Sequence, residues 1–80
     1  MKIGEAVQLR ILELCEEHQL SVNALCNLSG VTQSTVNNIL SGRNRSTTVS
    51  TLQKLCDGLG ISIRTFFDSD LFQNLEQELQ

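Results

Sequence analysis

Residues 21–41 read S-V-N-A-L-C-N-L-S-G-V-T-Q-S-T-V-N-N-I-L-S, two short helical patterns separated by a glycine. Ser21 and Thr32 are good helix N-caps, because their hydroxyl oxygens can accept hydrogen bonds from backbone N–H groups of the first turn. Gly30 can adopt the left-handed conformation that ends one helix and turns the chain toward the next. The apolar residues recur at helical spacing on the inward side of both helices, namely Val22, Leu25, Cys26, Val36, Ile39 and Leu40. The stretch therefore predicts a helix, a sharp turn and a second helix.

The outward side of the second helix carries no charged residue. An ordinary exposed helix is rich in Glu, Lys and Arg, which have good helix propensity and are well solvated. Short amides and hydroxyls instead can hydrogen-bond the edges of DNA bases. The alternative is a polar surface helix with no ligand, and the pattern favours base reading. The polar positions are Gln33, Ser34, Thr35, Asn37, Asn38 and Ser41.

Helical patterns continue on both sides of this stretch. Residues 4–17 predict an amphipathic first helix. Its inward residues are Val7, Ile11, Leu14 and Cys15, with Leu9 and Leu12 widening the apolar face. Thr48 is suited to cap a fourth helix that Gly60 ends. The inward stripe of that helix is Val49, Leu52, Leu55, Cys56 and Leu59.

The chain ends in two further short patterns. Ser62 is suited to cap a fifth helix carrying Ile63, Phe66 and Phe67. After Asp68 an apolar ridge predicts one more helix, which begins at residue 69 or 70 and includes Leu71, Phe72, Leu75 and Leu79. Such a short helix is unstable alone in water, so the ridge must pack on its own domain or on a second subunit.

Charge is unevenly distributed along the chain. Eighty residues make one domain, and their net charge of −3 argues against binding to nucleic acid. From His18 to Cys56, however, there is no acidic residue, and Arg43, Arg45 and Lys54 lie within that stretch. A protein that is acidic on average can still present one positive face.

The sequence excludes several other classes of protein. Glu5 and Arg10 interrupt any apolar run near the amino terminus, so we expect no signal peptide, no membrane span and a cytoplasmic location. Cys15, Cys26 and Cys56 are odd in number and lack C-x-x-C spacing, which predicts buried, reduced thiols and no metal site.

His18 is the single histidine, and no nucleophile or metal-spaced cluster accompanies it. At the end of the first helix it is better placed to interact with the helix dipole than to act as a ligand or base. We therefore expect no enzymatic activity and no cofactor.

The segment L-C-N-L-S-G-V-T-Q-S-T-V-N-N-I-L-S-G, followed by a basic loop and by L-x-x-L-C-D-G-L-G-I-S, resembles the phage lambda repressor/Cro-type helix-turn-helix family over residues 7–67. The resemblance implies an all-α fold, a compact five-helix bundle, here with a short C-terminal helix added. It divides the chain into a DNA-binding domain, residues 1–68, and a helical tail, residues 69–80. It also implies a transcriptional regulator that binds a palindromic operator in double-stranded DNA as a homodimer.

The resemblance places the third helix, residues 32–41, in the major groove. Gln33 then becomes the leading base reader, since its amide can pair with adenine N6 and N7. The implied base-reading residues are Gln33, Ser34, Asn37 and Asn38. The implied phosphate contacts are Ser21, Asn23, Thr32, Thr35, Arg43, Asn44 and Arg45, with Ser46 and Thr47 as weaker donors.

Three positions depart from the family pattern. Val22 stands where many members have a phosphate-binding Gln, and Thr47 stands where a proline is common. Many members also join the first and third helices by an Arg and Glu pair, and Cys15 and Leu40 occupy the matching positions. Replacing both charges by apolar groups can be neutral or stabilising. We therefore expect the scaffold to be kept and its polar clamp to be lost.

Two questions remain open at the level of sequence. The tail ridge can cover the fifth helix within one subunit, or it can form a two-fold contact, which we favour because two half-sites require two recognition helices. The residues of that contact would be Phe66, Phe67, Leu71, Phe72 and Leu75. A rival function is a protein-interaction module, such as an antitoxin or regulator partner, that holds another protein through its acidic first helix and tail.

Overall fold

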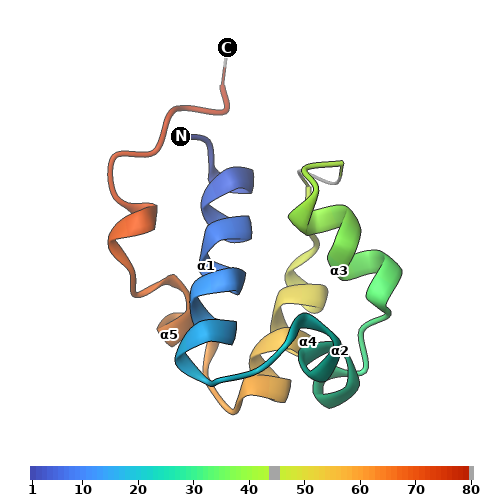
Figure 1. Ribbon diagram of the computed structural model, residues 1–80. Helices are drawn as coiled ribbons and strands as arrows, with labels where there is room; N and C mark the ends of the chain where they lie inside the picture. The colour runs from blue at the N-terminus through green and yellow to red at the C-terminus, as the bar shows by residue number, and fades with distance from the viewer. Residues whose placement is uncertain (44–45, 80) are drawn as a thin grey trace.

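The computed structural model describes residues 1–43 and 46–79. The described residues form a bundle of five α-helices and one 3-10 helix (Figure 1). The helices are α1 (Ile3–Glu17), α2 (Val22–Ser29), α3 (Gln33–Leu40), α4 (Val49–Leu59), α5 (Ile63–Phe67) and the 3-10 helix η1 (Asp70–Phe72). The predicted all-α, five-helix architecture is confirmed.

Side-chain caps define where α2, α3, α4 and α5 begin. Each capping hydroxyl accepts a hydrogen bond from the backbone N–H three residues later, at 3.0–3.2 Å. The caps are Ser21, Thr32, Thr48 and Ser62, as the sequence predicts. Gly30 and Gly60 end α2 and α4 with φ angles of 71° and 70°, in the left-handed region where a side chain would be strained.

A single core joins the helices. Its largest fully buried side chains are Phe66, Ile11, Leu14, Leu25, Ile39, Leu55 and Val36. Three predictions of inward residues are wrong, because Leu9, Leu12 and Val49 are 38%, 47% and 73% exposed. Leu9 and Leu12 lie on the side of α1 turned away from the bundle. On the side that faces the bundle, Ala6 and Arg10 are buried in addition to the predicted residues.

The close crossing of α2 and α4 depends on Gly58. A Cβ atom at this position would lie 2.9 Å from the backbone N and Cα atoms of Ser29. The two helices can therefore approach at this point only because α4 has no side chain there.

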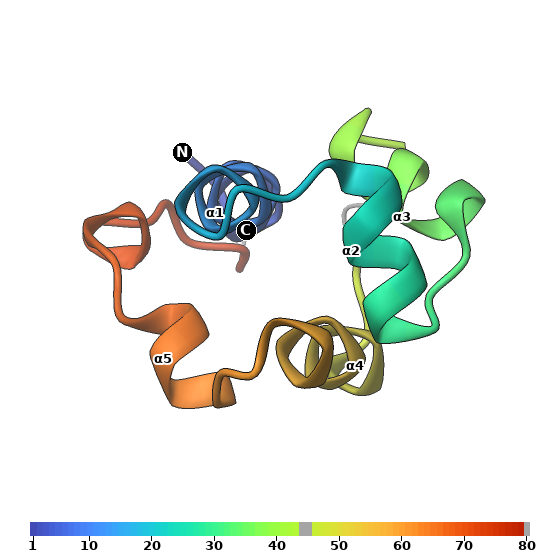
Figure 2. The same ribbon diagram turned by 60° about the horizontal axis from the view of Figure 1, so that its bottom comes forward.

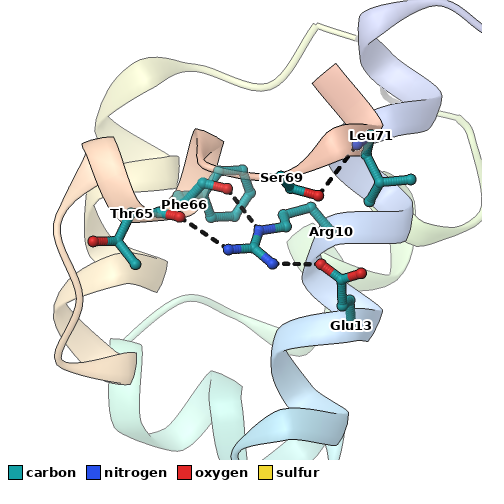
Figure 3. Close-up of polar contacts among 6 residues, drawn as sticks. All are labelled: Arg10, Glu13, Thr65, Phe66, Ser69 and Leu71. Carbon is teal, nitrogen blue, oxygen red and sulfur yellow. Dashed lines mark hydrogen bonds and ion pairs between the residues drawn. The ribbon is translucent and has the colours of Figure 1, made fainter. Parts of the chain in front are cut away.

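Arg10 is a buried arginine that joins α1 to the end of α5 (Figure 3). Its Nε donates to the carbonyl oxygen of Phe66 at 2.6 Å, and its Nη2 donates to that of Thr65 at 2.9 Å. Its Nη1 pairs with the Glu13 carboxylate. These contacts satisfy carbonyls that a helix end leaves without partners in the helix.

The bundle thus has a polar clamp, although not at the two positions considered in the sequence. Cys15 is buried among apolar residues and Leu40 packs half-buried against the same core. The charge lies one turn earlier, at Arg10, and joins α1 to α5 rather than to α3. The signal was present in the sequence, since Arg10 follows Val7 by three residues and precedes Leu14 by four.

The prediction that a short C-terminal helix includes Leu75 and Leu79 is wrong. After the 3-10 helix the chain takes a left-handed turn at Asn74, with φ 58°, and residues 75–79 contain no helix. Phe72 packs against Phe67, with ring centroids 4.8 Å apart. Tertiary contacts of this kind outweigh helix propensity in so short a segment. The tail therefore packs within its own subunit.

We expect Gly58→Ala to destabilise the protein, because backbone atoms of Ser29 cannot yield to the new methyl group. Overpacking of this kind costs about 1–3 kcal/mol. This cost exceeds the stabilisation that the better helix propensity of alanine over glycine would provide. The free energy of unfolding, measured by denaturant titration, tests this. Lys54→Ala, on the exposed side of α4, is the control and should change stability by less than about 0.5 kcal/mol. Equal stability of the two variants would contradict the close-packing account.

We expect Arg10→Met to lower the free energy of unfolding by about 1–3 kcal/mol, because it leaves a buried carbonyl of α5 without its donor. Glu16→Gln, at an exposed position of the same helix, is the control and should change stability by less than about 0.5 kcal/mol. Thermal unfolding followed by circular dichroism compares the two variants, and a neutral Arg10→Met would show that the hydrogen bonds to α5 contribute nothing to stability.

Candidate nucleic-acid interface

Helices α2 and α3 form a helix-turn-helix at one side of the bundle. Figure 2 shows α3 at the outer edge, beyond α2 and on the opposite side of α1 from η1. The turn between them is held locally: the Ser29 hydroxyl donates to the carbonyl of Leu25 at 2.7 Å and accepts the N–H of Val31 at 3.4 Å. Together with the left-handed Gly30, these bonds fix the angle at which α3 leaves α2.

Helix α3 has one side in the core and one side in solvent. Val36 and Ile39 are 0% and 1% exposed, so they anchor the helix rigidly to the bundle. Gln33, Ser34 and Asn37 are exposed on the opposite side, where positions three and four residues apart are neighbours. Of the four predicted base readers, the structure thus exposes three together.

Asn38, the fourth predicted base reader, is half-buried at the edge of the same face. Within the described part of the chain, no hydrogen bond engages the amides of Gln33, Asn37 or Asn38 or the hydroxyl of Ser34. Their donors and acceptors are therefore available to a ligand. The face is polar, uncharged and fixed in orientation by the core.

Two of the predicted phosphate contacts are already hydrogen-bonded to each other. The hydroxyl oxygens of Thr32 and Thr35 lie 2.8 Å apart, and that of Thr32 also caps α3. A pair of hydroxyls that shares one hydrogen bond still has one O–H left to donate. Ser21 likewise accepts the N–H of Ala24 through its oxygen and keeps its own proton to donate.

The other predicted phosphate contacts lie around the ends of α2 and α3. Asn23 is exposed in the first turn of α2, and Arg43 is exposed just after α3. Asn44 and Arg45 lie outside the described residues. Beyond them, Ser46 is exposed and Thr47 is half-buried before the start of α4. The described members therefore lie at or near the ends of α2 and α3.

Gln8 is a residue near this interface that the sequence did not single out. Its Nε2 would lie 3.5 Å from a Cβ atom placed on Gly42, so the side chain of α1 reaches the turn that follows α3. Gly42 has a φ of 82°. A polar residue at the edge of an amphipathic helix gives no sequence signal for such a contact.

Acidic side chains collect away from α3. Glu13 and Glu17 of α1 share a shallow surface pocket with Asp68 and Asp70, which flank the turn into η1. Both views of the ribbon place η1 on the side of α1 opposite α3 (Figures 1 and 2). These four carboxylates therefore lie away from the polar face of α3, and the net charge of −3 is unevenly distributed over the surface.

The three cysteines belong to the core rather than to the interface. Burial raises the pKa of each thiol; Cys26 raises that of Cys15 further and Asp57 that of Cys56. Such thiols stay protonated at neutral pH and are poor nucleophiles and metal ligands. Within residues 1–43 and 46–79, no group of three or more His, Cys, Asp or Glu residues is placed to hold a metal ion.

The residues predicted to form a dimer contact lie around α5 and η1. Phe66 is 0% exposed and has no surface left to offer a partner subunit. Phe67 and Phe72 are half-buried and pack on the core, and Leu71 and Leu75 are also half-buried.

Among the described helices none is long and apolar enough to cross a membrane.

Comparison with known proteins agrees with this geometry. A family model described as a Cro/C1-type HTH DNA-binding domain matches residues 10–69. The crystal structure of the prophage Lp1 protein 11 is similar to this chain with a TM-score of 0.78 and 41% sequence identity, over 86% of this chain and 92% of that one. A search of curated proteins found no match.

Proposed function

The chain belongs to the Cro/C1-type helix-turn-helix family of DNA-binding domains, and from that premise we propose that it is a sequence-specific transcriptional regulator. In this proposal α3 enters the major groove and the protein acts by occupying an operator. The observation that carries the proposal is the solvent face of α3, where Gln33, Ser34 and Asn37 stand exposed with no charged neighbour on the helix.

Base selection comes from the amides and hydroxyls of this face. Gln33 is the first residue of α3, so its side chain extends beyond the helix toward the groove floor. Its amide N–H can donate to N7 of adenine, and its amide oxygen can accept from the N6 amino group. No other base pair offers this bidentate pattern. Asn37 lies one turn further along, and Ser34 lies between the two. Asn38 contributes from the half-buried edge.

Affinity comes from the phosphate contacts around α3. The guanidinium of Arg43 supplies charge, and the hydroxyls and amide at the starts of α2 and α3 supply neutral donors. These are Ser21, Asn23, Thr32 and Thr35, to which we add Asn44 and Arg45 from outside the described residues. With so few cations, the protein depends more on neutral donors than most DNA-binding domains do.

A homodimer on a palindromic operator follows from the same proposal, since one α3 reads only one half-site. We propose that the half-buried apolar side chains around η1 form the contact, and we exclude Phe66 because it is fully buried. The contact residues are Phe67, Leu71, Phe72 and Leu75. Each keeps some exposed apolar surface while packing on its own subunit.

Gln33→Ala should relax base preference at one position of each half-site, with a loss of about 1–3 kcal/mol of discrimination. Selection from a random DNA pool, followed by sequencing, measures this for the wild type and the variant. Gln53→Ala, an exposed glutamine on α4, is the matched control and should leave the selected motif unchanged. An identical motif from Gln33→Ala would contradict the role of Gln33, and failure of the wild type to enrich any sequence would favour the protein-interaction module.

Leu71→Asp should shift the protein from dimer to monomer in sedimentation, because it places a charge in an apolar contact. The charge should also weaken binding to a two-half-site duplex more than binding to one half-site. A wild-type protein that sediments as a monomer both free and on its operator would contradict the dimer.

A further inference from the structure

The carboxyl-terminal tail folds back and pairs with the amino terminus. The left-handed turn at Asn74 reverses the chain, and the N–H of Glu76 donates to the carbonyl of Met1 at 3.0 Å. The Lys2 ammonium donates to the carbonyl of Gln77 at 2.9 Å. Figure 1 shows the tail, up to residue 79, returning to the amino-terminal end of α1. Two backbone segments far apart in sequence are thus held side by side.

Carboxylates of the tail also neutralise the cations of the amino terminus. The α-ammonium of Met1 lies 3.2 Å from Glu76 Oε2, and Nζ of Lys2 lies 4.0 Å from Glu78 Oε2. All four groups are partly exposed, with the two glutamate side chains at 63%. Exposed ion pairs of this kind are weak, so the tail can leave the amino terminus without unfolding the bundle.

The ion pairs between the tail and the amino terminus lie beside the proposed phosphate-binding loop. One surface groove is lined by Lys2, Glu5, Glu76 and Glu78, and also by Ser41, Gly42 and Ser46 of the loop after α3. The loop that begins at Ser41 leads directly into Arg43. A DNA backbone that contacts the loop therefore comes close to the tail carboxylates.

We propose that the acidic tail, residues 73–79, is an intramolecular electrostatic brake on DNA binding. It places two negative charges at the border of the DNA interface and cancels two positive charges that lie at the same place. When DNA binds, its phosphates must approach those carboxylates, which repel them. Release of the tail instead leaves a net positive amino terminus beside the loop. The inference rests on the proposed function, since it requires that DNA binds at the loop.

The double variant Glu76→Gln plus Glu78→Gln tests the brake. It removes both charges but keeps the backbone pairing of the tail with Met1 and Lys2. The matched control is Glu16→Gln plus Glu17→Gln, which changes the net charge equally at the other end of α1. The two ends of this helix are about 20 Å apart at 1.5 Å per residue, beyond the Debye length of about 10 Å in 0.1 M salt.

Fluorescence anisotropy measures the affinity of each protein for a duplex carrying the selected motif and for a scrambled duplex, across a salt series. We expect the tail variant to bind both duplexes about 3- to 10-fold more tightly than the control at low salt. The slope of log K against log salt should be steeper by about 1–2, because each newly available cation displaces about one counterion. A truncation after Leu75, which removes both carboxylates but keeps the proposed dimer contact, should show the same change.

Three results separate the possible failures. If the wild type binds DNA but the tail variant matches the control in affinity and slope, the brake is wrong and the proposed function stands. If tail removal weakens binding while thermal unfolding is unchanged, the tail assists binding, and the proposal is likewise overturned. If neither the wild type nor the tail variant binds any duplex, the proposed function itself fails.

Discussion

The close approach of α2 and α4 at Gly58 is the constraint on which the position of α3 depends. Ser29 lies against Gly58 and at the same time begins the turn to α3, where its hydroxyl bonds Leu25 and Val31. The distance between α2 and α4 therefore sets the place from which α3 departs. A larger residue in α4 would move the turn, and with it every side chain of the polar face. The packing of one helix crossing and the orientation of the polar face of α3 are thus linked through one serine.

Arg10 connects α1 to the end of α5 at the other side of the bundle. The short helix α5 ends against α1, and carbonyls of its last turn need donors. A buried guanidinium supplies them from α1, and Glu13 balances its charge from a partly exposed position. A buried charge is costly unless it is both paired and hydrogen-bonded, and Arg10 is both. This clamp leaves the contact between α1 and α3 free to be apolar, as Cys15 and Leu40 are.

The features that could be predicted from sequence are those fixed by neighbouring residues. Ser21, Thr32, Thr48 and Ser62 cap their helices because a hydroxyl reaches only the next turn. What failed depends on distant contacts. Val49 has an apolar side chain at the start of α4, but nothing in its helix shows that it lies open at a groove. The tail carries a helical ridge, yet Phe72 packs with Phe67 and the segment after Asn74 pairs with Met1. In the candidate site the exposure of Gln33, Ser34 and Asn37 agrees with the sequence pattern, and their contacts with DNA stay predictions.

Net charge is a poor guide to this protein because its charges are sorted by position. A phosphate responds to the charges within about one Debye length and is screened from the rest. The acidic residues around Glu13 and Asp70 lie beyond α1 from α3, so they lower the isoelectric point with little effect at the recognition face. Glu5, Glu76 and Glu78 are exceptions, since they line a groove with the loop after α3, and two of them, Glu76 and Glu78, belong to the tail. Those two carboxylates are therefore the acidic groups through which the tail can act on DNA affinity in the proposed brake.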